Sequence, residues 1–177
     1  MTSTRGNLRV DLNFPTGFRL RSQRLELIPA GAELAAVDWQ FRGTLSALLG
    51  ARVPAAWPPE LVADADAAQG GWWDWYVVRK DDEQQPELVG VAGLKGWPSV
   101  TGSVQIGCSF LPQAQGKGYG TEAVEALTSW LLTQPGVGTV TANVPRGNEA
   151  SAAILRKLGF RPGASQEGSM IRFERAR

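Results

Sequence analysis

The sequence predicts one mixed α/β or α+β domain, in which helices pack on a central sheet. Its length is 177 residues, which is typical of a single domain and long enough to bury a core without disulfides or metals. Apolar residues make up 43% and charged residues 20%, as in ordinary globular proteins. Short alternating apolar segments come first, and a strand–helix–strand–helix–strand order follows, which favours this fold class.

The first half of the chain reads as a lead-in followed by strands and helical stretches. Residues 1–17 are polar and contain glycine and proline, so we expect a flexible lead-in, with a single domain over 18–177. Alternation of apolar and polar residues predicts strands, and apolar spacings of three and four predict helices. The expected elements are a strand at 24–28, one helix or a broken pair over 31–49, a helical stretch from 61 to about 69, and hairpin strands at 75–79 and 88–94.

The second half alternates strands and helices. A third strand is expected at 103–111, with Cys108 facing inward. A glycine-rich turn over 113–120 leads into a helix that Pro135 ends. Further on, we expect a strand at 139–144, a helix capped by Asn148 and closed by Gly159, and a last strand at 169–174.

Composition excludes several kinds of chemistry. There is no histidine, so no histidine triad and no imidazole base can form. The one cysteine, Cys108, allows neither an intrachain disulfide nor a Cys/His zinc site, and we expect no metal. The net charge of +1 argues against broad binding to nucleic acid. Since no apolar run approaches a membrane span and no signal peptide is evident, we expect a cytoplasmic protein without membrane contact.

The turn after the third strand is the most informative segment. Its alternate glycines, Gly116, Gly118 and Gly120, let the backbone turn tightly and approach a ligand. The following helix offers unpaired N–H groups and a positive dipole end, which suit a phosphate. The spacing matches neither a Walker loop nor the dinucleotide fingerprint. A turn that merely starts a helix is the alternative interpretation of this segment alone.

Two ordered motifs resemble the GNAT family of N-acetyltransferases. Residues 113–118 (QAQGKG) match its Gln/Arg-x-x-Gly-x-Gly/Ala signature, and residues 148–160 resemble its Asn-x-x-Ser…Lys-x-Gly-Phe motif. The Asn-x-x-Ser form and the opening RLELI at 24–28 look like the branch of ribosomal-protein N-terminal acetyltransferases. The resemblance covers roughly residues 20–175, which is nearly the whole chain.

The resemblance implies a mostly antiparallel sheet flanked by helices, with one splayed pair of parallel strands. It implies acetyl-CoA as cosubstrate and direct transfer of the acetyl group to a primary amine, without a covalent intermediate. The diphosphate would lie on the N–H groups of residues 115–120, and an N–H on the third strand would stabilise the oxyanion. The implied cosubstrate-binding residues are Phe110, Leu111, Gln113, Gln115, Gly116, Lys117, Gly118, Tyr119, Gly120, Thr121, Asn148 and Ser151.

Two departures from the family pattern concern catalysis. Gln105 stands where many relatives carry a glutamate, and an amide cannot act as a base. Leu155 replaces the tyrosine that is thought to protonate the leaving thiolate. Ser151 is the remaining hydroxyl, either an acid or a plain first-turn residue. Without a strong base, an N-terminal or small-molecule α-amine is the easier acceptor. A carboxylate acting through water would weaken that preference, the candidates being Glu33, Asp38, Glu60 and Asp74.

Several interpretations stay open beside acetyl transfer. One is a non-catalytic acyl-CoA-binding or regulatory module of the same fold, and another is a different nucleotide-binding enzyme that uses the same turn. Relatives often pair as homodimers, but the sequence does not fix the oligomeric state. We expect Cys108 to be a buried structural thiol and the early arginines to form a solvated surface. Tryptophans 72, 73 and 75 fit packing and an acceptor site equally well.

Overall fold

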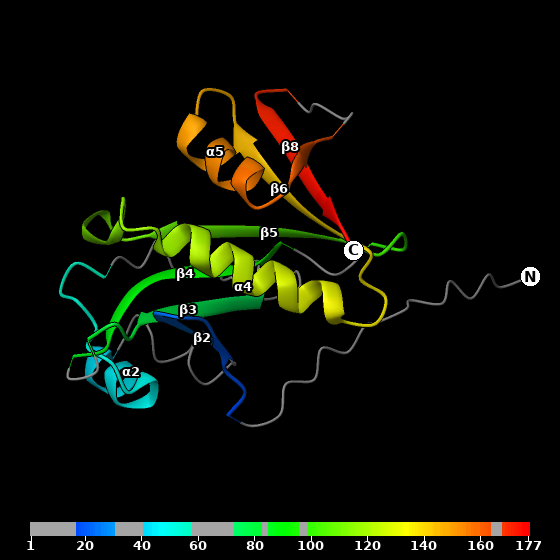
Figure 1. Ribbon diagram of the computed structural model, residues 1–177. Helices are drawn as coiled ribbons and strands as arrows, with labels where there is room; N and C mark the ends of the chain where they lie inside the picture. Colours follow the sequence, from blue (N-terminus) through cyan, green and yellow to red (C-terminus); the bar gives the residue numbers. More distant parts are fainter. Residues whose placement is uncertain (1–16, 31–40, 58–72, 83–84, 96–98, 164–167) are drawn as a thin grey trace, which may run out of the picture.

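The computed structural model describes residues 17–30, 41–57, 73–82, 85–95, 99–163 and 168–177. Its strands form one eight-stranded sheet in the order β1-β2-β3-β4-β5-β6-β8-β7 (Figure 1). The strands are β1 (Leu20–Arg21), β2 (Leu25–Pro29), β3 (Trp73–Arg79), β4 (Glu87–Lys95), β5 (Ser103–Phe110), β6 (Thr139–Pro145), β7 (Arg161–Pro162) and β8 (Met170–Ala176). The helical elements are α2 (Arg42–Leu49), η2 (Pro112–Ala114), α4 (Tyr119–Thr133) and α5 (Glu149–Lys157).

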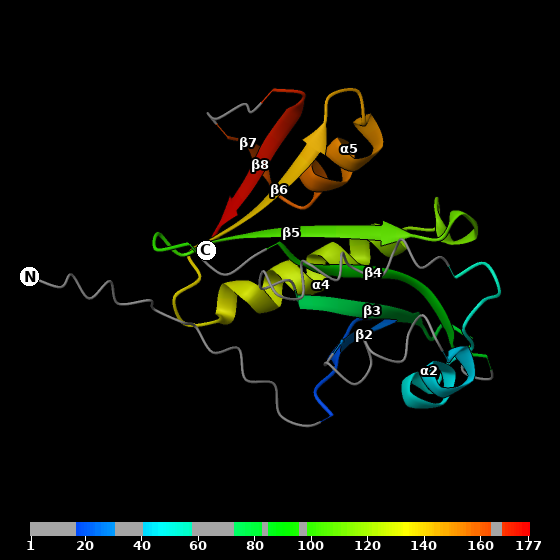
Figure 2. The same cartoon turned by 180° about the vertical axis from the view of Figure 1, so that it is seen from behind.

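One parallel pair interrupts an otherwise antiparallel sheet. β5 pairs with β6 in parallel, and every other neighbouring pair is antiparallel. The β5–β6 pairing joins only Ser103–Ile106 to Thr139–Ala142, although both strands continue beyond these residues. The two strands diverge from that point, as both views show (Figures 1 and 2). The predicted mixed sheet with one splayed parallel pair is therefore confirmed.

The core lies on both faces of the sheet. Trp75 on β3 is fully buried and packs against Trp130 of α4, with ring centroids 5.3 Å apart. The next residue, Tyr76, points to the opposite face, where the Trp57 ring lies 6.2 Å away. Trp75 and Trp57 are thus core residues, whereas Trp72 and the side chain of Trp73 lie outside the described parts of the chain.

The ends of α5 agree with the capping pattern of the sequence. The Asn148 side chain accepts a hydrogen bond from the Ser151 N–H at 3.1 Å, as an N-cap does. At the other end, Gly159 has a φ of 80°. The Gly159 N–H donates to Arg156 O and the Phe160 N–H donates to Leu155 O, which is a Schellman motif. These two caps fix the helix directly after β6.

Some expected elements differ from those observed. β1 and β7 were not expected, because strands of two residues carry no periodic signal. The expected helix over 31–49 is observed only as α2, and residues 31–40 lie outside the described parts. The helical stretch that ends near Gln69 and the lead-in also fall outside them and stay predictions. In the described residues, no helix is long and apolar enough to cross a membrane, and no cluster of three or more His, Cys, Asp or Glu side chains could bind a metal ion.

Candidate active site

An opening lies between β5 and β6 beyond their last paired residues. In the paired half of β5, Val104 and Ile106 are buried. Beyond it, Cys108 and Ser109 are exposed, although β5 still pairs with β4 as far as Phe110. No residue of β6 pairs with β5 beyond Ile106, so this half of β5 has no neighbouring strand on one edge. β5 is therefore accessible from the β6 side.

The hydrogen-bonding pattern of β5 shows which main-chain groups face this opening. The Leu111 N–H donates to Val89 O on the β4 side at 2.9 Å. In an antiparallel pair, only alternate residues bond to the partner strand, so Cys108, opposite Ala92, directs its N–H and C=O away from β4. Since β6 pairs with β5 only up to Ile106, the Cys108 N–H faces the opening. The family resemblance implied an N–H donor on this strand but not which residue carries it.

The glycine-rich turn presents a run of main-chain donors beside this opening. Gly116 and Gly118 have φ values of 73° and 81°, a conformation that favours glycine, and α4 starts directly afterwards. The first helical bond runs from the Glu122 N–H to Gly118 O. Among the described residues, the N–H groups of 116–121 consequently have no acceptor. A run of unpaired N–H groups at a helix start has the chemistry that suits an anion.

Two residues of the expected set contribute less than predicted. The Gln115 N–H is used within the protein, because it donates to Pro112 O at 3.2 Å, so the run of free donors begins one residue later. Its side-chain amide donates to Phe110 O at 3.0 Å and ties the turn to the end of β5. Leu111 is buried, with its N–H and C=O both bonded to other main-chain groups. It supports the turn and has no free polar group for a ligand.

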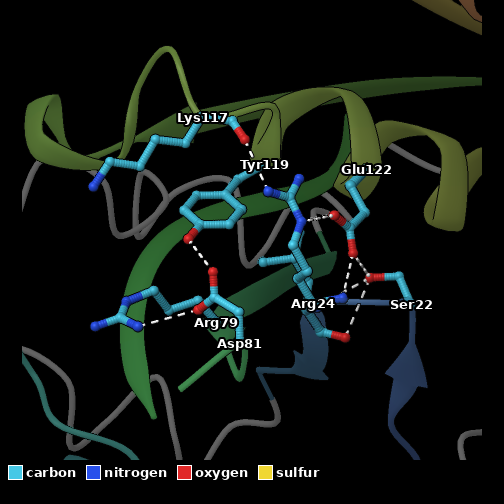
Figure 3. A network of polar contacts seen from close by, with 8 residues as sticks. Ser22, Arg24, Arg79, Asp81, Lys117, Tyr119 and Glu122 are labelled. Carbon is cyan, nitrogen blue, oxygen red and sulfur yellow. Dashed lines mark hydrogen bonds and ion pairs between the residues drawn. The ribbon is translucent and has the colours of Figure 1, made fainter. Parts of the chain in front are cut away.

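The Tyr119 side chain points away from the free donors and anchors the start of α4. Its hydroxyl donates to Asp81 at 2.6 Å, and Asp81 is also paired with Arg79 (Figure 3). The Tyr119 bond is the main reason why the pKa of Asp81 is held below its usual range. Burial, together with this bond, raises the pKa of Tyr119. Only the main chain of Tyr119 is available to a ligand.

Of the early arginines, Arg5 and Arg9 lie outside the described residues and Arg21 is exposed as expected, whereas Arg19 and Arg24 are partly buried in ion pairs. Arg24 is ion-paired with Glu122 on α4 at 2.8 Å (Figure 3). Arg19, Arg21 and Lys80 surround the buried Glu26 carboxylate. Burial alone would raise the pKa of Glu26, but the three hydrogen-bonded cations outweigh it and hold the pKa below its usual range.

The candidate catalytic side chains lie on separate elements. Ser151 is half-buried in the first turn of α5, which follows the diverging end of β6. Gln105 lies on the face of β5 opposite to Cys108, because side chains alternate along a strand. Leu155 is buried, as an apolar replacement would be. The four carboxylates considered as distant bases, or their side chains, lie outside the described parts of the chain.

Cys108 is exposed rather than buried, which corrects the sequence prediction. Its side chain shares a face with Ile106, as expected, but Cys108 lies beyond the last residue of β5 that pairs with β6. Protein atoms around the sulfur still disfavour the charged form and raise the pKa of the thiol to about 11. The thiol is therefore protonated at neutral pH and is a poor nucleophile.

This pKa predicts the reactivity of Cys108 towards alkylation. We expect slow labelling by iodoacetamide at pH 7, with a rate that rises about tenfold per pH unit towards pH 11, because only the thiolate reacts. Mass spectrometry of quenched samples gives the rate, and Cys108→Ala, which leaves no cysteine, gives the background. A rate that is already constant between pH 7 and 9 would contradict the raised pKa.

Comparison with known proteins identifies the family. The family model described as the acetyltransferase (GNAT) domain matches residues 45–161. The chain belongs to the GNAT family. Among curated proteins, an uncharacterised N-acetyltransferase, YjdG of Bacillus subtilis, is 36% identical over 90 residues, which is 51% of this chain and 52% of YjdG. Human alpha/beta-tubulin-N-acetyltransferase 9 is 43% identical over 49 residues, which is 28% of this chain and 24% of the human protein.

Solved structures share the fold of this GNAT domain. RimL, a ribosomal alpha-N-protein acetyltransferase in complex with coenzyme A, has a TM-score of 0.61 at 16% identity and covers 90% of this chain and 98% of its own. A GNAT-family acetyltransferase from Bacillus anthracis has a TM-score of 0.59 at 16% identity, with coverage of 90% and 98%. At such identities the likeness concerns the fold alone, and the chain spans about half the length of the curated relative YjdG.

Proposed function

We propose that this GNAT protein transfers an acetyl group from acetyl-CoA to a primary amine. The observation that carries the proposal is the run of unpaired N–H groups at residues 116–121, beside the opening between β5 and β6. A doubly charged diphosphate suits these donors, which the helix dipole of α4 reinforces. The exposed Lys117 adds a positive charge at the same turn, and Gln113 lies in the preceding η2 turn.

The opening suits the rest of the cosubstrate. A pantetheine arm resembles an extended peptide and can pair with the free edge of β5. The Cys108 N–H is the donor that would meet the thioester oxygen as negative charge develops on it. We propose that further residues line the cosubstrate site. Four contribute main-chain groups, namely Phe110, Tyr119, Gly120 and Thr121, and two lie at the start of α5, namely Asn148 and Ser151.

The reaction needs no residue to form a covalent intermediate. The amine nitrogen attacks the thioester carbon, the C–S bond breaks, and the amide forms as the thiolate leaves. Ser151 is the proposed hydroxyl donor to that thiolate, because its hydroxyl has no partner in the described residues. The amine loses its proton to water, with Gln105 able to orient that water but not to accept a proton.

The missing carboxylate favours a weakly basic acceptor. An α-amine with a pKa of about 7.8 is roughly 14% neutral at pH 7, whereas a lysine amine with a pKa of about 10.4 is roughly 0.04% neutral. The neutral fractions differ by roughly 300-fold. We therefore propose an N-terminal or small-molecule α-amine as the acceptor.

This acceptor preference is tested with matched peptides. One peptide has a free α-amine and an acetylated lysine, and the other has an acetylated α-amine and a free lysine. We expect the first to react at least 30-fold faster at pH 7, measured by thiol release from acetyl-CoA. Faster acetylation of the lysine peptide would contradict the proposal and indicate an undetected base.

A second candidate function is a non-catalytic acyl-CoA-binding module. Gln105 and Leu155, which replace the family's usual proton-transfer groups, favour it. The two candidates differ in turnover: the module would bind acetyl-CoA but release no thiol with any amine of a broad panel. Cytoplasmic location and pairing as a homodimer stay predictions.

A further inference from the structure

We propose that Arg24 is a positioning residue that orients the diphosphate-binding turn. The inference rests on the proposed function, because it assigns Arg24 a role in binding the same cosubstrate. The Arg24 Nη1 donates to Lys117 O in the turn at 3.0 Å (Figure 3). The guanidinium also lies over the Tyr119 ring, 4.8 Å from its centroid. Arg24 thus contacts the turn and the first residue of α4 together.

Peptide geometry connects this contact to ligand binding. In a trans peptide the carbonyl oxygen and the following N–H point in opposite directions, and the described residues contain no cis peptide bond. Because Lys117 O points towards Arg24, the Gly118 N–H points in the opposite direction, away from Arg24. Gly118, which bounds this peptide on one side, gives it conformational freedom to rotate when it is not held. Arg24 therefore keeps one donor in its binding orientation before the ligand arrives.

The guanidinium is itself fixed by Glu122. This carboxylate accepts hydrogen bonds from the Arg24 N–H at 2.6 Å, from Arg24 Nε at 2.8 Å and from the Ser22 hydroxyl at 2.7 Å. Burial opposes ionisation of Glu122, but these bonds outweigh it and hold its pKa below the usual range. Glu122 is therefore charged at neutral pH and locks Arg24 in place.

The pair also has an electrostatic consequence. A carboxylate in the first turn of α4 would repel the diphosphate that the helix start attracts. Arg24 neutralises Glu122 at a distance of 2.8 Å and so preserves the attraction. Lysine could supply this charge but not the planar fork that bonds Glu122 and Lys117 O at once. Charge and orientation can thus be separated by the Arg24→Lys variant.

The test compares two acetyl donors, acetyl-CoA and S-acetyl-pantetheine, which lacks the diphosphate. With the α-amine peptide, we expect Arg24→Lys and Arg24→Gln to lower kcat/KM for acetyl-CoA about tenfold or more, with kcat changed less than twofold. We expect kcat/KM for S-acetyl-pantetheine to stay within twofold. Arg21→Lys is the matched control, because Arg21 pairs with the buried Glu26 and does not touch the turn. This control variant should leave kcat/KM unchanged for both acetyl-CoA and S-acetyl-pantetheine.

Each outcome decides the proposal. The positioning role would be overturned if Arg24→Lys had the kcat/KM of the wild type, or if kcat/KM fell equally with both donors. Either result would leave the proposed acetyl transfer intact. A wild-type protein that does not distinguish the two donors would instead overturn the proposed use of the turn. If the Arg24 variants lack a folding transition, Ser22→Ala gives a milder loosening of Glu122. For Ser22→Ala we expect kcat/KM to fall two- to threefold with acetyl-CoA and to stay unchanged with S-acetyl-pantetheine. An unchanged kcat/KM with acetyl-CoA would contradict the proposal.

Discussion

Replacing Cys108 by proline is expected to lower kcat by about 100- to 1000-fold, the usual effect of removing one oxyanion donor. Proline has no N–H, and the Cys108 N–H is the group that faces the opening beyond the last β5–β6 pair. Because neither neighbouring strand uses this N–H, its removal breaks no ladder hydrogen bond. Thiol release at saturating acetyl-CoA, with the α-amine peptide, measures the effect.

Two control variants separate catalysis from folding. Cys108→Ala keeps the main-chain donor and should retain the wild-type kcat within a few-fold, because the protonated thiol has no role in the proposed reaction. Gly107→Pro removes an N–H on the β4 side and should lower the melting temperature more than Cys108→Pro. A folded Cys108→Pro protein with unchanged kcat would show that the oxyanion is stabilised elsewhere.

Replacing Gly118 by valine is expected to weaken acetyl-CoA binding by about 2–3 kcal/mol, which is roughly 30- to 150-fold. Gly118 has a φ of 81°, which a β-branched residue adopts only with strain. A Cβ there would also lie 3.3 Å from the Arg24 guanidinium. The variant should therefore shift the donors of the turn, and calorimetric titration with desulfo-coenzyme A measures the loss.

Gly50→Val is the matched control for this variant. Gly50 also has a positive φ, 62°, and lies at the end of α2 with open space around it. We expect similar backbone strain and a similar loss of melting temperature, but an unchanged affinity. Equal losses of affinity in the two variants would mean that Gly118 acts only through overall stability.

Local patterns predicted the parts of the fold that depend on neighbours in sequence. The alternation in β2 and β5, and the caps at Asn148 and Gly159, follow from residues within a few positions of one another. The glycine turn was predicted for the same reason, since Gly118 and the helix it starts are adjacent. Together with the family motifs, these signals were sufficient for the fold class and for the position of the turn.

Long-range contacts were not predictable in this way. The bond from the Arg24 N–H to Glu122 spans 98 positions, and nothing near Arg24 announces it. Cys108 has the sequence pattern of a buried strand residue, but it lies beyond the last β5–β6 pair and is exposed. The Gln115 N–H is lost as a ligand donor because the η2 turn uses it. Main-chain groups of a strand point alternately to its two neighbours. Counting back from Leu111 would therefore have identified the Cys108 N–H as the free donor, once the pairing with β4 was known.

The most direct measurement is a crystal structure of the full chain with acetyl-CoA or desulfo-coenzyme A. We expect diphosphate oxygens about 3 Å from N–H groups of residues 116–121. We also expect the pantetheine arm to occupy the opening between β5 and β6. Coenzyme bound at another surface while this turn stays empty, or no binding at millimolar concentration, would contradict it.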